Sequence, residues 1–116
     1  MTPRQLSLDS VGEPIFQVVE PSHAGHDGSV LAVTGELDRD TAGLLLDALV
    51  RAPGAGGTIA LDLAGLTFID AAGARSLLAC RSIAAGHGMM LTVRNLRPAV
   101  RRVLEILDIL GRLETP

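Results

Sequence analysis

Two aspartates, Asp38 and Asp70, each stand just ahead of a segment with helical spacing of apolar residues. Paired carboxylates are side chains that carry general acid–base catalysis in many enzymes. At a helix start, however, an aspartate also accepts hydrogen bonds from backbone N–H groups that lack a partner within the helix, and Asp40 could do the same for the first helix. Capping therefore accounts for these aspartates, and they do not by themselves predict a reaction.

The nucleophilic side chains lack the neighbouring base that would activate them. Ser76 and Ser82 fall within one predicted helix, and no histidine lies within a few residues of either. Cys80 borders the apolar side of the same helix, which is typical of a core residue. We therefore expect no catalytic residue and no enzymatic activity.

Ligand-binding patterns are equally weak. His23 and His26 share a loop, but two histidines without a third firm ligand are more typical of solvent-exposed side chains than of a metal site. Gly54 and Gly56 follow a predicted helix instead of opening one, which is the wrong context for a phosphate-binding loop. We expect no metal site and no cofactor.

The charge of the chain argues against nucleic-acid binding. The formal net charge is −3, whereas a general nucleic-acid-binding protein needs a strong basic patch. Four arginines do cluster late in the chain, where a solvated helix face is favoured over a phosphate site: Arg94, Arg97, Arg101 and Arg102.

Length and composition indicate a single globular domain. The chain has 116 residues, of which 47% are hydrophobic, enough to build a core at this size. A single cysteine excludes an internal disulfide and a Cys-based zinc site. Every apolar run is too short to span a membrane, and residues 1–10 lack the apolar centre of a signal peptide. These features predict a cytoplasmic protein without a membrane segment.

The hydrophobic spacing predicts seven elements in the order β-β-α-β-α-β-α. Strands are expected at residues 15–19, 30–34, 58–63 and 89–93, and helices at residues 41–51, at residues 71–85 and from Pro98 onward. Strands that alternate with helices imply a mostly parallel sheet, and the opening hairpin adds an antiparallel edge strand. The predicted fold is therefore α/β with a small mixed four-stranded sheet. Residues 1–13 are expected to be a flexible arm, and residues 14–116 the folded domain.

The junction F-I-D-A-A-G at residues 68–73 is the most informative segment. After Asp70, the residues Ala71, Ala72 and Gly73 form a first helical turn with almost no side-chain bulk. Such a turn exposes its free N–H groups and lets another backbone come very close. Composition leaves two interpretations open: a tightly packed helix start, or a platform on which a partner docks.

Residues 34–42 read T-G-E-L-D-R-D-T-A, and residues 68–73 read F-I-D-A-A-G. These two segments resemble two signatures of the STAS domains of bacterial anti-sigma-factor antagonists, T-G-E-[LI]-D-x-x-[ST]-A and aromatic-[ILM]-D-S-[ST]-G. Residues 98–104, P-A-V-R-R-V-L, resemble the start of the family's closing helix. The resemblance covers about residues 14–113 and implies helices packed largely on one side of the sheet.

The resemblance also implies a function in partner switching. Members of this family bind an anti-sigma factor, usually a serine kinase with a GHKL-type ATPase fold, and so release a sigma factor that they contact only indirectly. The kinase switches the antagonist off by phosphorylating the serine that follows the aspartate of the second signature. The expected role is therefore transcription regulation by an anti-anti-sigma factor, as a monomer or weak homodimer.

This chain departs from the family at the phosphorylated serine. Asp70 matches the family's aspartate and Gly73 its glycine, but Ala71 stands at the phosphoacceptor position and Ala72 at the following Ser or Thr. Alanine has no hydroxyl to accept a phosphoryl group, so we expect constitutive binding. The resemblance implies these partner-binding residues: Gly35, Glu36, Leu37, Asp38, Thr41, Ile69, Asp70, Ala71, Ala72 and Gly73.

Two alternatives remain open. The chain could be a structural or ligand-sensing STAS module, acting as an assembly scaffold or a sensor of a small molecule or nucleotide outside direct sigma control. Phosphorylation could instead use another hydroxyl, at Thr41, Thr67 or Ser76, of which Ser76 is the least favoured because it lies inside a helix.

Overall fold

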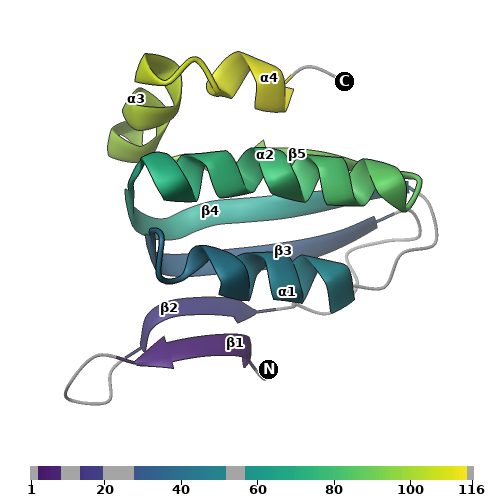
Figure 1. Cartoon of the computed structure of the whole chain (residues 1–116), viewed down its shortest axis with the longest axis horizontal. Coiled ribbons are helices and arrows are strands. Elements are labelled where there is room, and N and C mark those ends of the chain that lie inside the picture. Colours follow the sequence, from purple (N-terminus) through teal and green to yellow (C-terminus); the bar gives the residue numbers. More distant parts are fainter. Residues whose placement is uncertain (1–2, 9–13, 20–27, 52–56, 115–116) are drawn as a thin grey trace.

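The computed structural model describes residues 3–8, 14–19, 28–51 and 57–114 and shows one sheet with helices packed against it (Figure 1). The strands follow one another across the sheet in the order β1-β2-β3-β4-β5. β1 pairs with β2 and β2 with β3 in antiparallel fashion, whereas β3, β4 and β5 run parallel. The elements are β1 (Pro3–Leu8), β2 (Pro14–Val19), β3 (Gly28–Leu37), α1 (Ala42–Arg51), β4 (Gly57–Ile69), α2 (Ala71–Gly86), β5 (Met89–Arg94), α3 (Pro98–Ile106) and α4 (Leu110–Glu114).

The core lies between the sheet and the helices α1 and α2, which lie side by side across one face (Figure 1). Alternate residues of the central strands are buried, such as Leu31 and Val33 on β3 and Ile59 and Leu61 on β4, as expected when one face of a strand meets helices. Leu77 is fully buried on α2. α3 and α4 lie at the β5 side of the molecule (Figure 1).

The predicted fold class is confirmed, with one addition to the sheet. All four predicted strands are present as β2 to β5, and the expected helices separate them. Residues 3–8 of the expected flexible arm instead form β1, which pairs with β2. The opening antiparallel strand β2 is therefore an inner strand, because β1 continues the sheet beyond it.

β4 is longer than predicted because residues 64–69 continue the strand instead of leading into the next helix. β4 accommodates Gly65 with an irregularity in its pairing with β3: Ala32 pairs with Asp62, and Thr34 pairs with Gly65. A second shift follows, since Gly35 pairs with Leu66 and Glu36 with Phe68. At each shift β4 carries one extra residue, which is the pattern of a β-bulge.

The closing helix is divided in two, whereas a single helix was predicted. α3 ends at Ile106, and Asp108 has a φ of 58° in the left-handed region. The N–H of Ile109 donates to the carbonyl of Leu104 over 2.8 Å, and α4 begins one residue later. The change of direction buries Ile109, Leu110 and Leu113, so the division adds apolar residues to the core.

Candidate functional site

The loop that joins β3 to α1 is built around Asp38. Its Oδ1 atom accepts hydrogen bonds from the N–H groups of Asp40 and Thr41 over 2.9 and 3.0 Å. The Thr41 hydroxyl donates to the carbonyl of Glu36 over 2.9 Å and accepts from the N–H of Asp38 over 3.0 Å. Of the two aspartates proposed to cap this helix start, the structure assigns the role to Asp38.

The start of α2 has the predicted N-cap. Asp70 has an extended backbone, and its Oδ1 atom accepts a hydrogen bond from the N–H of Gly73 over 2.7 Å. The bond satisfies one of the donors that every helix start leaves without a partner. Both candidate catalytic aspartates thus act as caps, as the sequence indicated.

Gly73 brings the two helix starts together. The N–H of Asp70 donates to the carbonyl of Leu37 over 3.3 Å, at the end of β3. A Cβ atom on Gly73 would overlap the oxygen of that same carbonyl and lie 2.8 Å from its carbon, closer than side chains pack. The backbone that approaches the bare helix turn is therefore the chain's own β3, so the tight-packing interpretation holds for Gly73.

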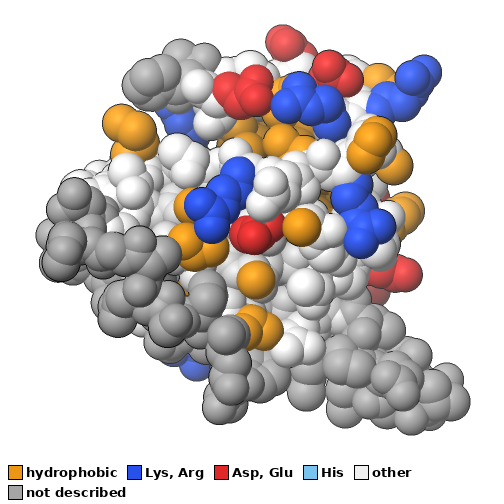
Figure 2. All heavy atoms as spheres, turned by 180° about the vertical axis from the view of Figure 1, so that it is seen from behind, with side chains coloured by type: hydrophobic (Ala, Val, Ile, Leu, Met, Phe, Trp, Pro, Cys, Tyr) orange, Lys and Arg blue, Asp and Glu red, His pale blue; other side chains and the backbone are white. Residues whose placement is uncertain are grey.

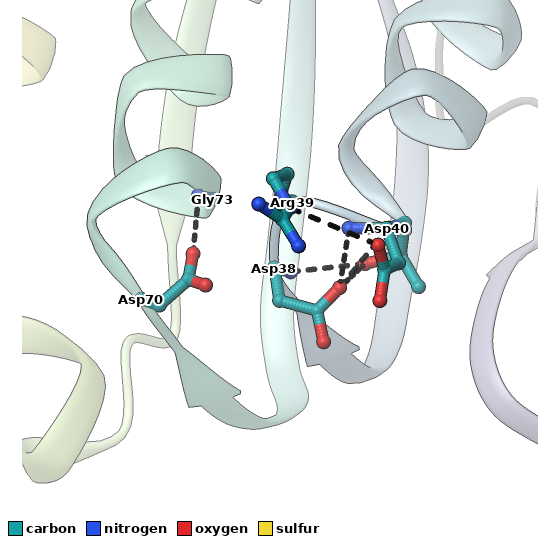
Figure 3. Close-up of polar contacts among 6 residues, drawn as sticks. Asp38, Arg39, Asp40, Asp70 and Gly73 are labelled. Carbon is teal, nitrogen blue, oxygen red and sulfur yellow. Dashed lines mark hydrogen bonds and ion pairs between the residues drawn. The ribbon is translucent and has the colours of Figure 1, made fainter.

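The two signature segments, which lie far apart in the sequence, line one shallow depression of about 280 Å³. Figure 3 shows Asp38 and Asp70 at the neighbouring helix starts, with Arg39 between them. The depression is lined by the carboxylates of Asp38, Asp40 and Asp70, by the guanidinium of Arg39 and by Ala72. Asp40 and Arg39 are highly exposed and approach each other only to 4.0 Å, which is a weak ion pair.

Several predicted partner-binding residues are buried beneath this surface and are not part of it. Leu37, Thr41, Ile69 and Gly73 are buried, so their side chains face the interior and cannot meet a partner without a rearrangement of the fold. Gly35 has a φ of 98°, a conformation that favours glycine, which gives it a backbone role. The predicted residues that reach the surface are Glu36, Asp38, Asp70, Ala71 and Ala72.

Four residues at this end of the molecule were absent from the predicted set. Arg39 and Asp40 are exposed in the loop, and Thr67 and Phe68 are exposed on β4. The polar run between Leu37 and Thr41 was a usable signal for the first two. Phe68 gave no such signal, because large apolar residues are usually buried and Phe68 stands next to Ile69, which is buried.

The three alternative phosphoacceptors differ in accessibility. Thr41 is 2% exposed and Ser76 5% exposed, and the Ser76 hydroxyl donates to the carbonyl of Gly73 over 2.6 Å. Thr67 is exposed, and its hydroxyl donates to the carbonyl of Gly35 over 3.1 Å. Among these three hydroxyls, only that of Thr67 lies at the surface.

The other sequence candidates have structural roles where the structure describes them. Cys80 is fully buried, as predicted, and burial raises the pKa of its thiol to about 12. Arg97 donates to the carbonyl of Ala64 over 2.6 Å, and Arg101 lies 3.6 Å from Glu114. The loop histidines His23 and His26 and the glycines Gly54 and Gly56 lie outside the described residues.

Neither a metal-binding cluster nor a membrane-spanning helix is found among the described residues. They contain no cluster of three or more His, Cys, Asp or Glu side chains that could hold a metal ion. Within the same ranges, no helix is both long enough and apolar enough to cross a membrane.

Replacing Asp70 with alanine is expected to lower the free energy of unfolding by about 1 kcal/mol, because the N-cap of α2 is lost. Asp70→Asn should recover most of the loss, since its amide oxygen can still accept from Gly73. Asp40→Ala is the matched control: its carboxylate makes only the weak contact with Arg39, and no measurable change is expected. Urea unfolding of the three variants measures the effect, and equal losses for Asp70→Ala and Asp40→Ala would refute the capping role.

Comparison with protein families gives one extensive match. A family model described as "Mlab, STAS domain" matches residues 22–114, which is most of the chain. No curated protein matches the sequence significantly.

Several solved structures share the fold. An anti-sigma factor antagonist from Mycobacterium paratuberculosis is 24% identical with a TM-score of 0.66, and the match covers 85% of this chain and 83% of that one. The anti-sigma factor antagonist SpoIIAA in its unphosphorylated form is 26% identical with a TM-score of 0.62, and 84% of each chain is covered. The murine anion transporter Slc26a9 is 19% identical with a TM-score of 0.60, but the match covers only 14% of that longer chain.

Proposed function

The chain belongs to the STAS domain family, and from this membership we propose that it is a non-enzymatic anti-sigma-factor antagonist. It binds an anti-sigma factor, a serine kinase with a GHKL-type ATPase fold, in the cytoplasm, and thereby releases a sigma factor that it does not itself contact. The similarity to two anti-sigma factor antagonists over more than four fifths of the chain supports this role.

The observation that carries the proposal is that residues of both signature segments lie together on one surface. Asp38, Asp40, Asp70 and Ala72 line the same depression, and the hydrogen bond and close packing between Leu37 and the α2 start hold the segments together. A rigid, preformed surface lowers the entropic cost of binding. The anti-sigma factor docks on this surface, across the starts of α1 and α2.

The regulation of this docking differs from that of phosphorylated family members. Ala71 is half-buried at the first position of α2 and has no hydroxyl. A phosphate at this position would add about −1.5 to −2 charges that repel the neighbouring Asp70 carboxylate, and its bulk would block the close approach of a partner. Because Ala71 cannot receive that phosphate, the chain binds its anti-sigma factor constitutively.

The test is a pull-down with the full chain as bait. Anti-sigma kinases of the GHKL type should be recovered from a lysate of the source organism and identified by mass spectrometry. Each kinase is then purified, and its Kd for the chain is measured. Recovery of none of these kinases, together with no measurable binding by the purified proteins, would refute the proposed function.

A second candidate function, ligand sensing, is favoured by one observation. A depression of about 370 Å³ lies between α2, β5 and α4 and is lined mainly by apolar side chains, among them Met89, Met90, Leu91 and Leu113. Ligand pockets are commonly apolar and of this size. Native mass spectrometry of the purified protein discriminates the two candidates, because a sensor would retain a small molecule. Light scattering would detect the large homo-oligomer expected of an assembly scaffold.

A further inference from the structure

Phe68 is a large aromatic side chain that remains 48% exposed at the end of β4. The chain has two phenylalanines, no tryptophan and no tyrosine, and the other phenylalanine, Phe16, is fully buried. Exposing an aromatic ring to water is unfavourable, and aromatic residues are enriched at the centres of protein interfaces. Phe68 is thus the one aromatic side chain that the protein offers to a partner.

The pairing of β3 with β4 places Phe68 on the sheet face opposite α1 and α2. Glu36 pairs with Phe68, and Leu37 pairs with Ile69. Leu37 and Ile69 are buried, and successive side chains of a strand point to opposite faces. Glu36 and Phe68 therefore lie side by side on the other face. Figure 2 views the molecule from the side away from α1 and α2, where hydrophobic side chains stand among acidic and basic ones.

Phe68 has one carboxylate neighbour on the paired strand and another two residues along the chain. Glu36 is its exposed neighbour across the strands, and Asp70 follows it by two residues. Asp70 belongs to the depression that Asp38 and Asp40 also line, where Arg39 is the basic side chain. An apolar ring with carboxylates nearby complements an apolar pocket flanked by positive charge, and such complementarity guides association and fixes the register of docking.

We propose that Phe68 is the apolar anchor of the docking surface and inserts into an apolar pocket of the anti-sigma factor whose rim carries Arg or Lys side chains. The inference rests on the proposed function and adds the sheet face and the chemistry of the partner's pocket. The partner binds at the carboxyl end of the parallel strands. It covers the starts of α1 and α2 on one face of the sheet and contacts Phe68 and Glu36 on the other face.

The experiment compares Phe68→Ser with Val50→Ala. Val50 is 56% exposed and lies in the last turn of α1, so it matches Phe68 in exposure but lies at the other end of that helix from the docking surface. The Kd of each variant is measured by isothermal titration calorimetry with the purified GHKL-type anti-sigma kinases of the same organism. Phe68→Ser is expected to raise the Kd by roughly 30-fold, the effect of losing an interface hot spot. Val50→Ala should leave the Kd unchanged.

Three further measurements complete the test. Phe68→Leu should restore most of the affinity, because leucine can still fill an apolar pocket, and thermal unfolding should show that all variants fold like the wild type. Higher salt should weaken binding of the wild type and of Phe68→Ser by the same factor, since screening acts on the carboxylates and not on the ring.

The outcomes separate this inference from the proposed function. If the wild type binds a kinase and Phe68→Ser binds equally well, the inference is wrong while the proposed function stands. If binding of the wild type does not weaken at high salt, the proposed Arg or Lys rim of the partner's pocket is wrong. If the wild type binds no kinase, both are overturned. Self-association of the wild type that Phe68→Ser abolishes would show that a second copy of this chain occupies the surface, and would also overturn the inference.

Discussion

Gly73→Ala is expected to lower the free energy of unfolding by about 2–4 kcal/mol, one of the largest effects of any single methyl group added to this protein. The new Cβ would overlap the Leu37 carbonyl oxygen and lie 2.8 Å from its carbon. Both atoms belong to the backbone, so no side-chain rotation can relieve the overlap. The start of α2 must move away from β3, which also separates the two halves of the docking surface.

Gly43→Ala is the matched control for this prediction. Gly43 lies in the first turn of α1, as Gly73 lies in the first turn of α2, but no atom lies within 4 Å of a Cβ atom built on it. Alanine is the better helix former, so Gly43→Ala should keep or raise the stability, by up to about 1 kcal/mol. Urea unfolding of both variants gives the comparison. If Gly73→Ala is as stable as Gly43→Ala, the close approach of α2 to β3 is not what requires glycine.

Ala71→Ser is expected to convert a constitutive binder into a switchable one. Incubation of this variant with its anti-sigma kinase and ATP should transfer the γ-phosphoryl group to the serine hydroxyl oxygen, with release of ADP and of the hydroxyl proton. The phosphorylated variant should bind the kinase at least about tenfold more weakly, because the phosphate adds bulk at the docking surface and repels the Asp70 carboxylate at the start of α2. The wild type should stay unlabelled under the same conditions.

Ala72→Ser is the control for that experiment. It places a hydroxyl one residue later in the same helical turn, at the position that the resemblance assigns to the unmodified Ser or Thr, and it should remain unlabelled. Mass spectrometry of proteolytic fragments locates any phosphate. Label on the wild type at Thr67, the exposed hydroxyl of the three alternatives, would contradict constitutive binding and support regulation through that threonine. Absence of label on Ala71→Ser would contradict the assignment of Ala71 to the phosphoacceptor position.

The local sequence predicted much of the fold because each element carries its own signal. The apolar spacing located β2 to β5 and the helices, and Asp70 marked the start of α2, where the structure shows its cap. β1 was missed because its residues are mixed and polar, and its partner strand gives it the strand conformation. The division between α3 and α4 was missed because Asp108 has a left-handed backbone conformation, whereas the usual sequence signal for that conformation is a glycine.

The sequence by itself determined the family signatures, the absence of a hydroxyl at Ala71 and the elements that flank each signature. Only the tertiary structure decided which signature residues reach a partner. The pairing of β3 with β4 buries Leu37 and Ile69, and the extra residue in β4 near Thr67 places Phe68 on the exposed face. Register and bulges depend on hydrogen bonds between strands that lie far apart in the chain, so no local pattern encodes them. The contacts between Leu37 and the start of α2 also bring Asp38 close to Asp70, and they make Gly73 a packing residue inside the protein.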